Sequence, residues 1–311
     1  MTSITKERRW EPAVWERSYH KVLELGEALK NNEFMLVYQP KHNLAKNRFT
    51  GVEALLRWPR RRQGQVPIDK VIDLAERSGM IVPIGEWVIR TALKQVKLWQ
   101  DNGLTIDISI NVSPRQLMEE GFAAMIADVA KVTGVDPSRV EFEITERIAS
   151  DPEQLLAVIG EVRAMGFRFS LDDFGTGYNS LAYLGSIPVD TLKIDQRFTR
   201  ECTSSIPKAA IIKSIIQLAK SLRLQVVAEG VETKDQLQFM QEHDCQVLQG
   251  YLFSKPISAA AIETLMANQK MEQTEPEAPP SCIHCHAVLI DDRTHNEQVC
   301  HACVRKLLLG K

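Results

Sequence analysis

The chain has 311 residues, of which 44% are hydrophobic and 25% charged, and its formal net charge is −2. This composition is typical of a globular protein, and so small a charge provides no general attraction to nucleic acid or to anionic membranes. No apolar run approaches the ~20 residues that span a bilayer, and the polar N-terminus has no signal-peptide core. We therefore expect a cytoplasmic protein with no membrane or sensor module and no nucleic-acid partner. The length suits one large α/β barrel or two ordinary domains.

Strands and helices are expected to alternate along the chain. The patterns predict a helix over 10–31, strands over 34–40 and 49–58, helices over 69–78 and 84–101, a strand over 106–112, a helix from Pro114, a strand over 140–145, a helix over 153–165, strands over 167–171 and 192–195, a helix over 207–222, a strand over 224–229, a helix from Thr233, a strand over 247–251 and a helix over 258–268. This order indicates a parallel sheet with helical crossovers. Eight strands in about 250 residues predict a closed (β/α)8 TIM-type barrel, with a doubly wound open sheet as the alternative.

The polarity of four strands favours the barrel. In the segments 107–111, 141–145, 168–172 and 191–195, one face is polar and the other aliphatic. An open doubly wound sheet buries both faces under helices and tends to be apolar on both. We expect the aliphatic faces to meet the helices and the polar faces to line the interior of a barrel.

Two adjacent carboxylates, Asp172 and Asp173, follow the strand 167–171 and precede a glycine-punctuated loop. Neighbouring residues of a regular strand point to opposite faces, but a turn of the backbone at the strand end lets both carboxylates reach one site. Hard cations such as Mg²⁺ or Mn²⁺ prefer such oxygen ligands. An ordinary turn is the alternative interpretation, because Asp and Gly are common turn residues.

Several polar residues are expected at the carboxyl ends of barrel strands, where the active sites of such barrels lie. They are Asn111, Glu143, Asp172, Lys193 and Glu229, while Glu53 shares a strand face with Arg57. So many carboxylates in one small volume would repel one another unless divalent cations neutralised them. Two such ions bridged by one Asp would activate a water for displacement at phosphorus. Solvated loop carboxylates are the alternative for any one of these residues.

These motifs make the chain from about residue 25 to 257 resemble an EAL domain, the family of cyclic di-GMP phosphodiesterases. The matching segments are Tyr38-Gln39-Pro40, Glu53 to Trp58, Asn111 to Gln116, Glu143 to Glu146, Asp172 to Tyr178, Leu192 to Asp195, Ala228 to Thr233 and Gln249 to Tyr251. The resemblance implies a modified barrel whose first strand runs antiparallel to the others. It places a helical lead-in at 1–24 and the barrel at 25–268.

The resemblance also implies a metal centre with two Mg²⁺ or Mn²⁺ ions. It assigns the first ion to Glu53, Asn111, Glu143 and Asp172, and the second to Asp172 and Asp173. Glu229 would act through water on the metal, and Lys193 would hold or help deprotonate the attacking water. The catalytic set is therefore Lys193, Glu229, Glu53 and Asp173.

The substrate contacts implied by the resemblance are Arg57, Gln39, Leu56 and Gln249. Glu146 would brace the loop from Asp173 to Tyr178, and a homodimer is expected. The family usually has Ser at the position of Asn179, from which we expect only a modest effect. Lys41, Lys46 and the run Arg60-Arg61-Arg62 are interpreted as solvated surface charge, with steering of an anionic dinucleotide as the alternative.

The expected activity is hydrolysis of cyclic di-GMP to linear pGpG, which lowers the level of the second messenger. Metal-assisted phosphodiester chemistry follows from the residues, whereas this particular substrate comes from the resemblance. The alternatives are a non-catalytic cyclic di-GMP receptor and an adaptor, each acting through the C-terminal segment.

The C-terminal segment differs in composition from the rest of the chain. Residues 269–280 are polar and proline-rich, which predicts a flexible linker. Beyond the linker, residues 281–311 contain two C-x2-C pairs, made of Cys282, Cys285, Cys300 and Cys303. This spacing predicts a structural zinc knuckle, with disulfides as the alternative. We expect the knuckle to regulate the protein or to dock a partner.

Overall fold

The computed structural model describes residues 12–60, 64–65, 67–145, 152–175 and 184–274. The chain divides into two compact units, residues 1–263 and 264–311. The elements are α1 (Pro12–Lys30), β1 (Met35–Asn43), β2 (Arg48–Arg57), β3 (Pro59–Arg60), β4 (Gly64–Gln65), α2 (Ile68–Ser78), α3 (Ile81–Asp101), β5 (Asp107–Asn111), α4 (Pro114–Leu117), α5 (Phe122–Thr133), η1 (Pro137–Arg139), β6 (Val140–Thr145), α6 (Pro152–Ala164), β7 (Arg168–Phe174), β8 (Thr191–Ile194), α8 (Gln196–Thr199), α9 (Ile206–Ser221), β9 (Gln225–Ala228), α10 (Lys234–Glu242), β10 (Val247–Gln249) and α11 (Ala259–Thr274).

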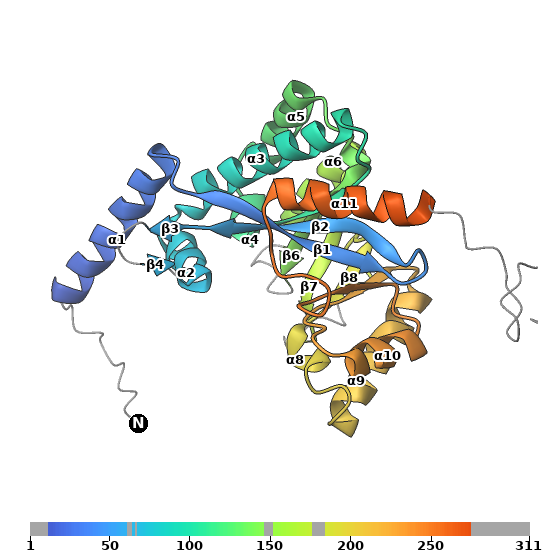
Figure 1. Cartoon of the computed structure of the whole chain (residues 1–311). Coiled ribbons are helices and arrows are strands. Elements are labelled where there is room, and N and C mark those ends of the chain that lie inside the picture. Colours follow the sequence, from blue (N-terminus) through green and yellow to red (C-terminus); the bar gives the residue numbers. More distant parts are fainter. Residues whose placement is uncertain (1–11, 61–63, 66, 146–151, 176–183, 275–311) are drawn as a thin grey trace, which may run out of the picture. The chain divides into compact units, whose positions relative to one another are not determined.

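Eight strands form a closed barrel in the order β1-β10-β9-β8-β7-β6-β5-β2. Strand β1 is antiparallel to both of its neighbours, β2 and β10, and the other neighbouring strands pair in parallel. In Figure 1, β1 and β2 are the long blue strands, and helices such as α3, α6 and α9 lie outside the strands. The predicted barrel and its antiparallel first strand are confirmed, and the open-sheet alternative is wrong.

The aliphatic strand faces pack against the helices, as the strand polarity predicts. Ile108, Ile110 and Phe142 are fully buried, and the Phe142 ring lies 5.7 Å from that of Phe169 between centroids. Trp99 of α3 is also fully buried. Each such side chain contributes roughly 1.5–3 kcal/mol by leaving water. This layer holds the strands in register and so fixes the positions of the side chains on their inner faces.

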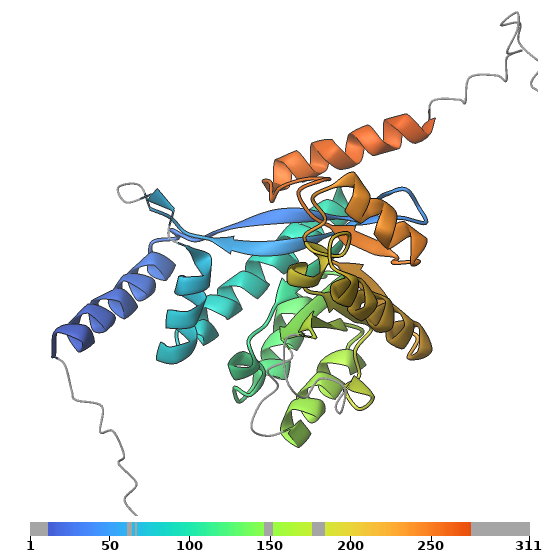
Figure 2. The same cartoon turned by 90° about the horizontal axis from the view of Figure 1, so that it is seen from below.

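Two expected elements differ in extent. The helix expected from Pro114 ends at Leu117, and a second helix begins at Phe122, because Gly121 between them adopts a left-handed backbone (φ 82°). Helix α11 runs to Thr274 and so includes the first residues of the segment expected to be a linker. In the second view (Figure 2), α3, α6 and α9 again lie outside the strands. Within the described part of the chain, no helix is both long and apolar enough to span a membrane.

Candidate active site

The centre of the barrel interior is the ammonium group of Lys193, on β8. Its side chain is completely buried, and four carboxylates from four other parts of the barrel surround it. The Nζ atom lies 2.6 Å from Glu143 Oε2, 2.6 Å from Glu229 Oε1, 3.2 Å from Asp172 Oδ1 and 3.8 Å from Glu53 Oε2. Side chains as far apart in the sequence as Glu53 and Glu229 therefore meet at one lysine.

Glu53 is held by two amide side chains. Asn111 Nδ2 donates to Glu53 Oε1 at 2.6 Å, and Gln249 Nε2 donates to Glu53 Oε2 at 2.7 Å. The same Gln249 nitrogen lies 3.1 Å from Gln39 Oε1. Strand β1 pairs with both β2 and β10, which brings Gln39 opposite Glu53 and lets Gln249 reach the Glu53 carboxylate.

A second polar group lies inside the barrel next to Glu143. Lys41 Nζ lies 2.8 Å from Glu143 Oε1 and 2.6 Å from Ser109 Oγ. Ser109 Oγ and Thr191 Oγ1 in turn donate to the two carboxylate oxygens of Glu141, at 2.9 and 2.6 Å. All five side chains are buried, so the polar strand faces do line the barrel interior.

The backbone turns at the end of β7, where the two adjacent carboxylates Asp172 and Asp173 lie. The pairing of β7 with β8 shifts register between Leu171 and Phe174, and Asp173 adopts a left-handed backbone with φ 56°. The Asp173 N–H donates to Asp172 Oδ1 at 2.8 Å. Asp172 faces Lys193, whereas the Asp173 carboxyl forms a hydrogen bond with Asp195. Burial, this hydrogen bond and the nearby Asp172 raise the pKa of Asp173 to about 7.

Charge is distributed unevenly within the cluster. Burial, reinforced by neighbouring carboxylates, raises the pKa of Glu53 and raises that of Glu229 well above its usual range. Burial acts on Glu143 in the same direction, but the ammonium groups of Lys193 and Lys41 outweigh it and lower the pKa of Glu143 to about 2. The surrounding carboxylates outweigh burial at Lys193 too and raise its pKa, so this lysine is held as a cation.

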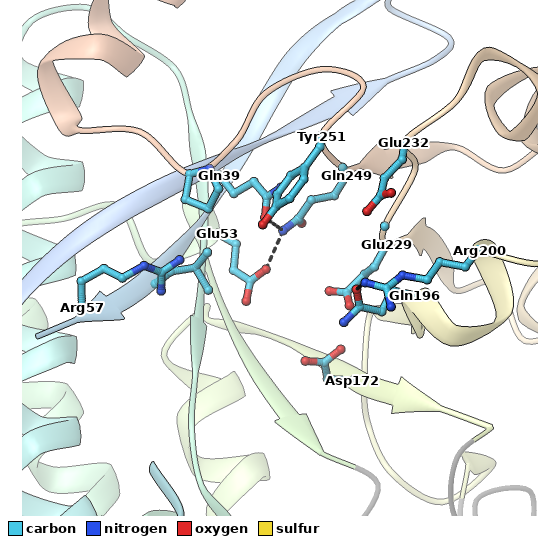
Figure 3. Close-up of a pocket in the computed structure, with 14 residues that line it drawn as sticks. Gln39, Glu53, Arg57, Asp172, Gln196, Arg200, Glu229, Glu232, Gln249 and Tyr251 are labelled. Carbon is cyan, nitrogen blue, oxygen red and sulfur yellow. Dashed lines mark hydrogen bonds between the residues drawn. The ribbon is translucent and has the colours of Figure 1, made fainter. Parts of the chain in front are cut away.

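A pocket of about 270 Å³ opens above this cluster (Figure 3). In the figure, Glu53 and Arg57 lie on one side, and Glu229, Gln196 and Arg200 lie on the other. The lining residues are Gln39, Glu53, Leu55, Arg57, Asp172, Gln196, Arg200, Glu229, Gly230, Glu232, Gln249, Gly250, Tyr251 and Pro256. A ligand in this pocket would therefore contact carboxylates on the floor and two arginines on opposite walls.

The donor set suits divalent cations. Four carboxylates, from Glu53, Glu143, Asp172 and Glu229, form direct ion pairs with Lys193 and Lys41, so these six groups have a net charge of −2 when all are ionised. The buried Oε1 atom of Gln249 has no hydrogen-bond partner among the described residues. In the present arrangement the described side chains form no open group of three metal ligands, because Lys193 occupies the centre. A cation would therefore replace some of the contacts of this lysine.

The structure brings together most of the site residues predicted from the sequence. Glu53, Asn111, Glu143, Asp172, Lys193, Glu229, Gln39 and Gln249 form one connected cluster, Asp173 adjoins it, and Arg57 lines the pocket.

Leu56 is the exception, since Leu55 lines the pocket among the described residues. Alternate residues of a strand share a face, so the side chain of Leu56 points away from the face that carries Glu53 and Arg57. The predictions for Glu146 and for Cys282, Cys285, Cys300 and Cys303 lie outside the described residues.

The interpretation of Lys41 as solvated surface charge is wrong, because its side chain is buried inside the barrel. Lys41 lies two residues after Gln39, on the same face of β1, and this parity is the signal that could have placed it. Sequence reasoning also missed several residues of the site. Gln196 and Arg200, with i,i+4 spacing, directly follow β8, and Arg200 Nη2 donates to Gln196 Oε1 at 3.0 Å. Glu232 and Tyr251 come from the loops after β9 and β10.

The closed barrel with one antiparallel strand, and the acidic pocket at the carboxyl ends of its parallel strands, define an α/β-barrel protein with a site suited to cations and anionic ligands. The chain belongs to the EAL domain family, whose model matches residues 23–256.

Two relatives with assigned activities are similar in sequence to this chain over most of the barrel. The bifunctional diguanylate cyclase/cyclic di-GMP phosphodiesterase MucR of Pseudomonas aeruginosa is 38% identical over 247 residues, which are 79% of this chain and 36% of MucR. The cyclic di-GMP phosphodiesterase PdeR of Escherichia coli is 35% identical over 240 residues, which are 77% of this chain and 36% of PdeR. The chain thus spans about a third of the length of these relatives.

Solved structures show the same architecture. The MucR phosphodiesterase in complex with c-di-GMP matches with a TM-score of 0.74 and 37% identity, over 79% of this chain and 99% of that one. The EAL enzyme Bd1971 in its cAMP-bound form matches with a TM-score of 0.78 and 34% identity, over 81% of this chain and 71% of that one.

Proposed function

We propose that this protein is a metal-dependent phosphodiesterase that hydrolyses one phosphodiester bond of cyclic di-GMP to give linear pGpG. The observation that carries the proposal is the cluster of four carboxylates around the buried Lys193, three of which, Glu53, Asp172 and Glu229, line a pocket with arginines on its walls. The similarity to MucR and PdeR, which are described as cyclic di-GMP phosphodiesterases, supports this substrate.

Two Mg²⁺ or Mn²⁺ ions are the proposed cofactors. Glu53, Asn111, Glu143 and Asp172 would hold the first, and Asp172 and Asp173 the second. When bound, the ions would supply charge neutralisation at the phosphate and a more acidic water. The excess negative charge of the cluster and the unpartnered Gln249 Oε1 atom support this assignment.

The side chains of this chain would handle the substrate and the proton. Arg57 binds a phosphate, a role that suits its planar donor fork. Lys193, held as an ammonium ion, orients the attacking water by donating a hydrogen bond to it. Glu229 has a raised pKa and lines the pocket, so its carboxylate is suited to accept a proton from that water.

The chemical step is balanced within the substrate and water. The water oxygen forms a bond to phosphorus, the bond from phosphorus to the ribose 3′ oxygen breaks, and the leaving oxygen ends as a hydroxyl group. The product is the opened dinucleotide with a 5′-phosphate. In a cell, this reaction would lower the level of the second messenger.

The remaining proposals concern localisation, oligomeric state and the C-terminal cysteines. We propose a cytoplasmic homodimer, with Glu146 bracing the loop after Asp173. The four C-terminal cysteines would form a zinc element that regulates the enzyme or docks a protein partner. The homodimer and the role of Glu146 rest on the family resemblance, and the zinc element rests on the cysteine spacing.

The test is chromatography of purified protein incubated with cyclic di-GMP and either Mg²⁺ or Mn²⁺. We expect metal-dependent formation of pGpG by the wild type and a loss of at least about a hundredfold in Glu53→Ala, because the variant lacks a group placed at the metal. Glu120→Ala is the matched control, since Glu120 is exposed and lies outside the cluster. Tight binding of intact cyclic di-GMP without product would replace the enzyme with a receptor.

A further inference from the structure

Lys41 is a buried cation with one direct ion-pair partner in the part of the chain that the structure describes. It is 5% exposed, and its register partners on the neighbouring strands are Gly51 and Gln249. Within the described residues, its one ion pair is with Glu143, at 2.8 Å from Oε1. Its other contact, Ser109 Oγ at 2.6 Å, is neutral, and it does not line the pocket. Nothing in the proposed mechanism uses this lysine.

The two oxygens of Glu143 are therefore held by two different cations. Lys193 contacts Oε2 at 2.6 Å, but it also contacts three further carboxylates and keeps partners if it releases this oxygen. Lys41 has no second direct ion pair among the described residues, and the carboxylates of Glu141 and Glu53 attract it only from farther away. Leaving a buried charge without its partner is strongly destabilising, so Lys41 stays on Oε1 when another cation approaches Glu143.

We infer that Lys41 is a positioning residue that restricts Glu143 to one available oxygen and thereby makes the site prefer Mg²⁺ or Mn²⁺ over Ca²⁺. The inference rests on the proposed function, in which Glu143 is a metal ligand. Mg²⁺ requires near-octahedral coordination by single oxygens, whereas Ca²⁺ takes six to eight oxygens and often both oxygens of one carboxylate. A Glu143 whose second oxygen is occupied by an ammonium group suits the first kind of ion and disfavours the second.

Isothermal titration of the full-length, metal-free protein with MgCl₂ alone and with CaCl₂ alone tests this inference. The measured quantity is the ratio of the Mg²⁺ dissociation constant to the Ca²⁺ dissociation constant at the tighter site. Both ions carry the same charge, so the loss of the Lys41 charge changes both affinities alike and largely cancels in the ratio. For Lys41→Met we expect the ratio to rise about tenfold, because Ca²⁺ gains an oxygen ligand that Mg²⁺ does not use.

Two further variants keep the experiment decisive. Lys41→Gln is uncharged and shorter by one atom, so it should shift the ratio in the same direction and provides the test if Lys41→Met does not fold. Ser109→Ala removes the other partner of Lys41 but leaves its pair with Glu143, so the ratio should stay at the wild-type value. Thermal melting of each metal-free variant shows that the titrated protein is folded.

The outcomes separate the two hypotheses. If the wild type binds Mg²⁺ but both Lys41 variants keep its Mg²⁺-to-Ca²⁺ ratio, the inference is wrong and the proposed function stands. If the wild type binds neither Mg²⁺ nor Ca²⁺, both fall together. A similar shift in Ser109→Ala would also overturn the inference, because the effect would then not depend on the contact with Glu143.

Discussion

Glu143 and Glu229 show how two carboxylates on the same lysine acquire different properties. Two ammonium groups hold the pKa of Glu143 at about 2, whereas burial raises the pKa of Glu229, which has only Lys193 as an ion-pair partner among the described residues. Groups whose pKa values are displaced in opposite directions can serve as anion and as proton acceptor in one site. This division supports Glu143 as a cation ligand and Glu229 as the base.

His42 provides a prediction at the residue scale. Its ring stacks on Phe253 with centroids 4.8 Å apart, burial lowers its pKa, and its buried Nδ1 atom has no hydrogen-bond partner among the described residues. The unfolded chain therefore binds a proton more readily than the folded one, so this histidine lowers stability as the pH falls through about 6.5. His42→Phe should remove that contribution.

The measurement is urea unfolding in EDTA at pH 7.5 and at pH 5.5. The wild type should lose more unfolding free energy between these two values than His42→Phe, since other titrating groups affect both proteins alike. An equal loss in the two proteins would show that His42 does not titrate differently on folding.

At the scale of elements, the contact between α3 and α4 supports the end of β5. Ser113 and Gln116 cap α4 reciprocally, directly after the strand that ends at Asn111. Gln116 is buried, and a Cβ atom at Gly85 of α3 would lie 1.7 Å from its Nε2 atom. Gly85 thus allows the helix to approach the capping side chain, which in turn helps to place Asn111.

A matched pair of glycine variants tests this contact. Gly85→Ala should lower the unfolding free energy by about 1–3 kcal/mol, because the methyl group overpacks the contact with Gln116. Gly160→Ala, at an exposed position of helix α6 with nothing within 4 Å of the new Cβ, should raise it by about 0.5–1 kcal/mol. Chemical unfolding monitored by circular dichroism measures both, and changes of the same sign would contradict the packing argument.

At the scale of the whole molecule, the antiparallel β1 completes both the barrel and the site. Because β1 lies between β2 and β10, it brings Gln39 and Lys41 next to Glu53 and Gln249. In a site built only by parallel strands, the carboxyl ends of the strands would supply every ligand. Here the middle of an antiparallel strand contributes an amide and a cation as well.

The C-terminal cysteines give a prediction for the complete chain. We expect the full-length protein to retain one more Zn²⁺ ion per chain after dialysis than the double variant Cys282→Ser/Cys285→Ser, because four thiolates are needed to close the tetrahedral shell. Elemental analysis of the two purified proteins measures the difference. Equal zinc contents would favour the disulfide alternative, which counting free thiols under denaturing conditions would then reveal.

The sequence by itself determined the family, the alternation of strands and helices, and the acidic residues at the strand ends. These features follow from local periodicity and from motifs such as Asp172-Asp173, which do not depend on contacts between distant residues. The polar parity of the strands was also sufficient to favour a barrel over an open sheet. Leu55 could have been preferred to Leu56 from the same parity.

Only the tertiary structure decided which charges meet. Lys41 belongs to no recognised motif, and its role depends on the closure of β1 against β2 and β10, which places its Nζ 2.8 Å from Glu143 Oε1, 102 residues away in the chain. The opposite pKa displacements of Glu143 and Glu229 likewise depend on distances to Lys193 and on burial. Electrostatic interactions are set by separation in space and by the surrounding medium, and neither quantity is encoded in local sequence.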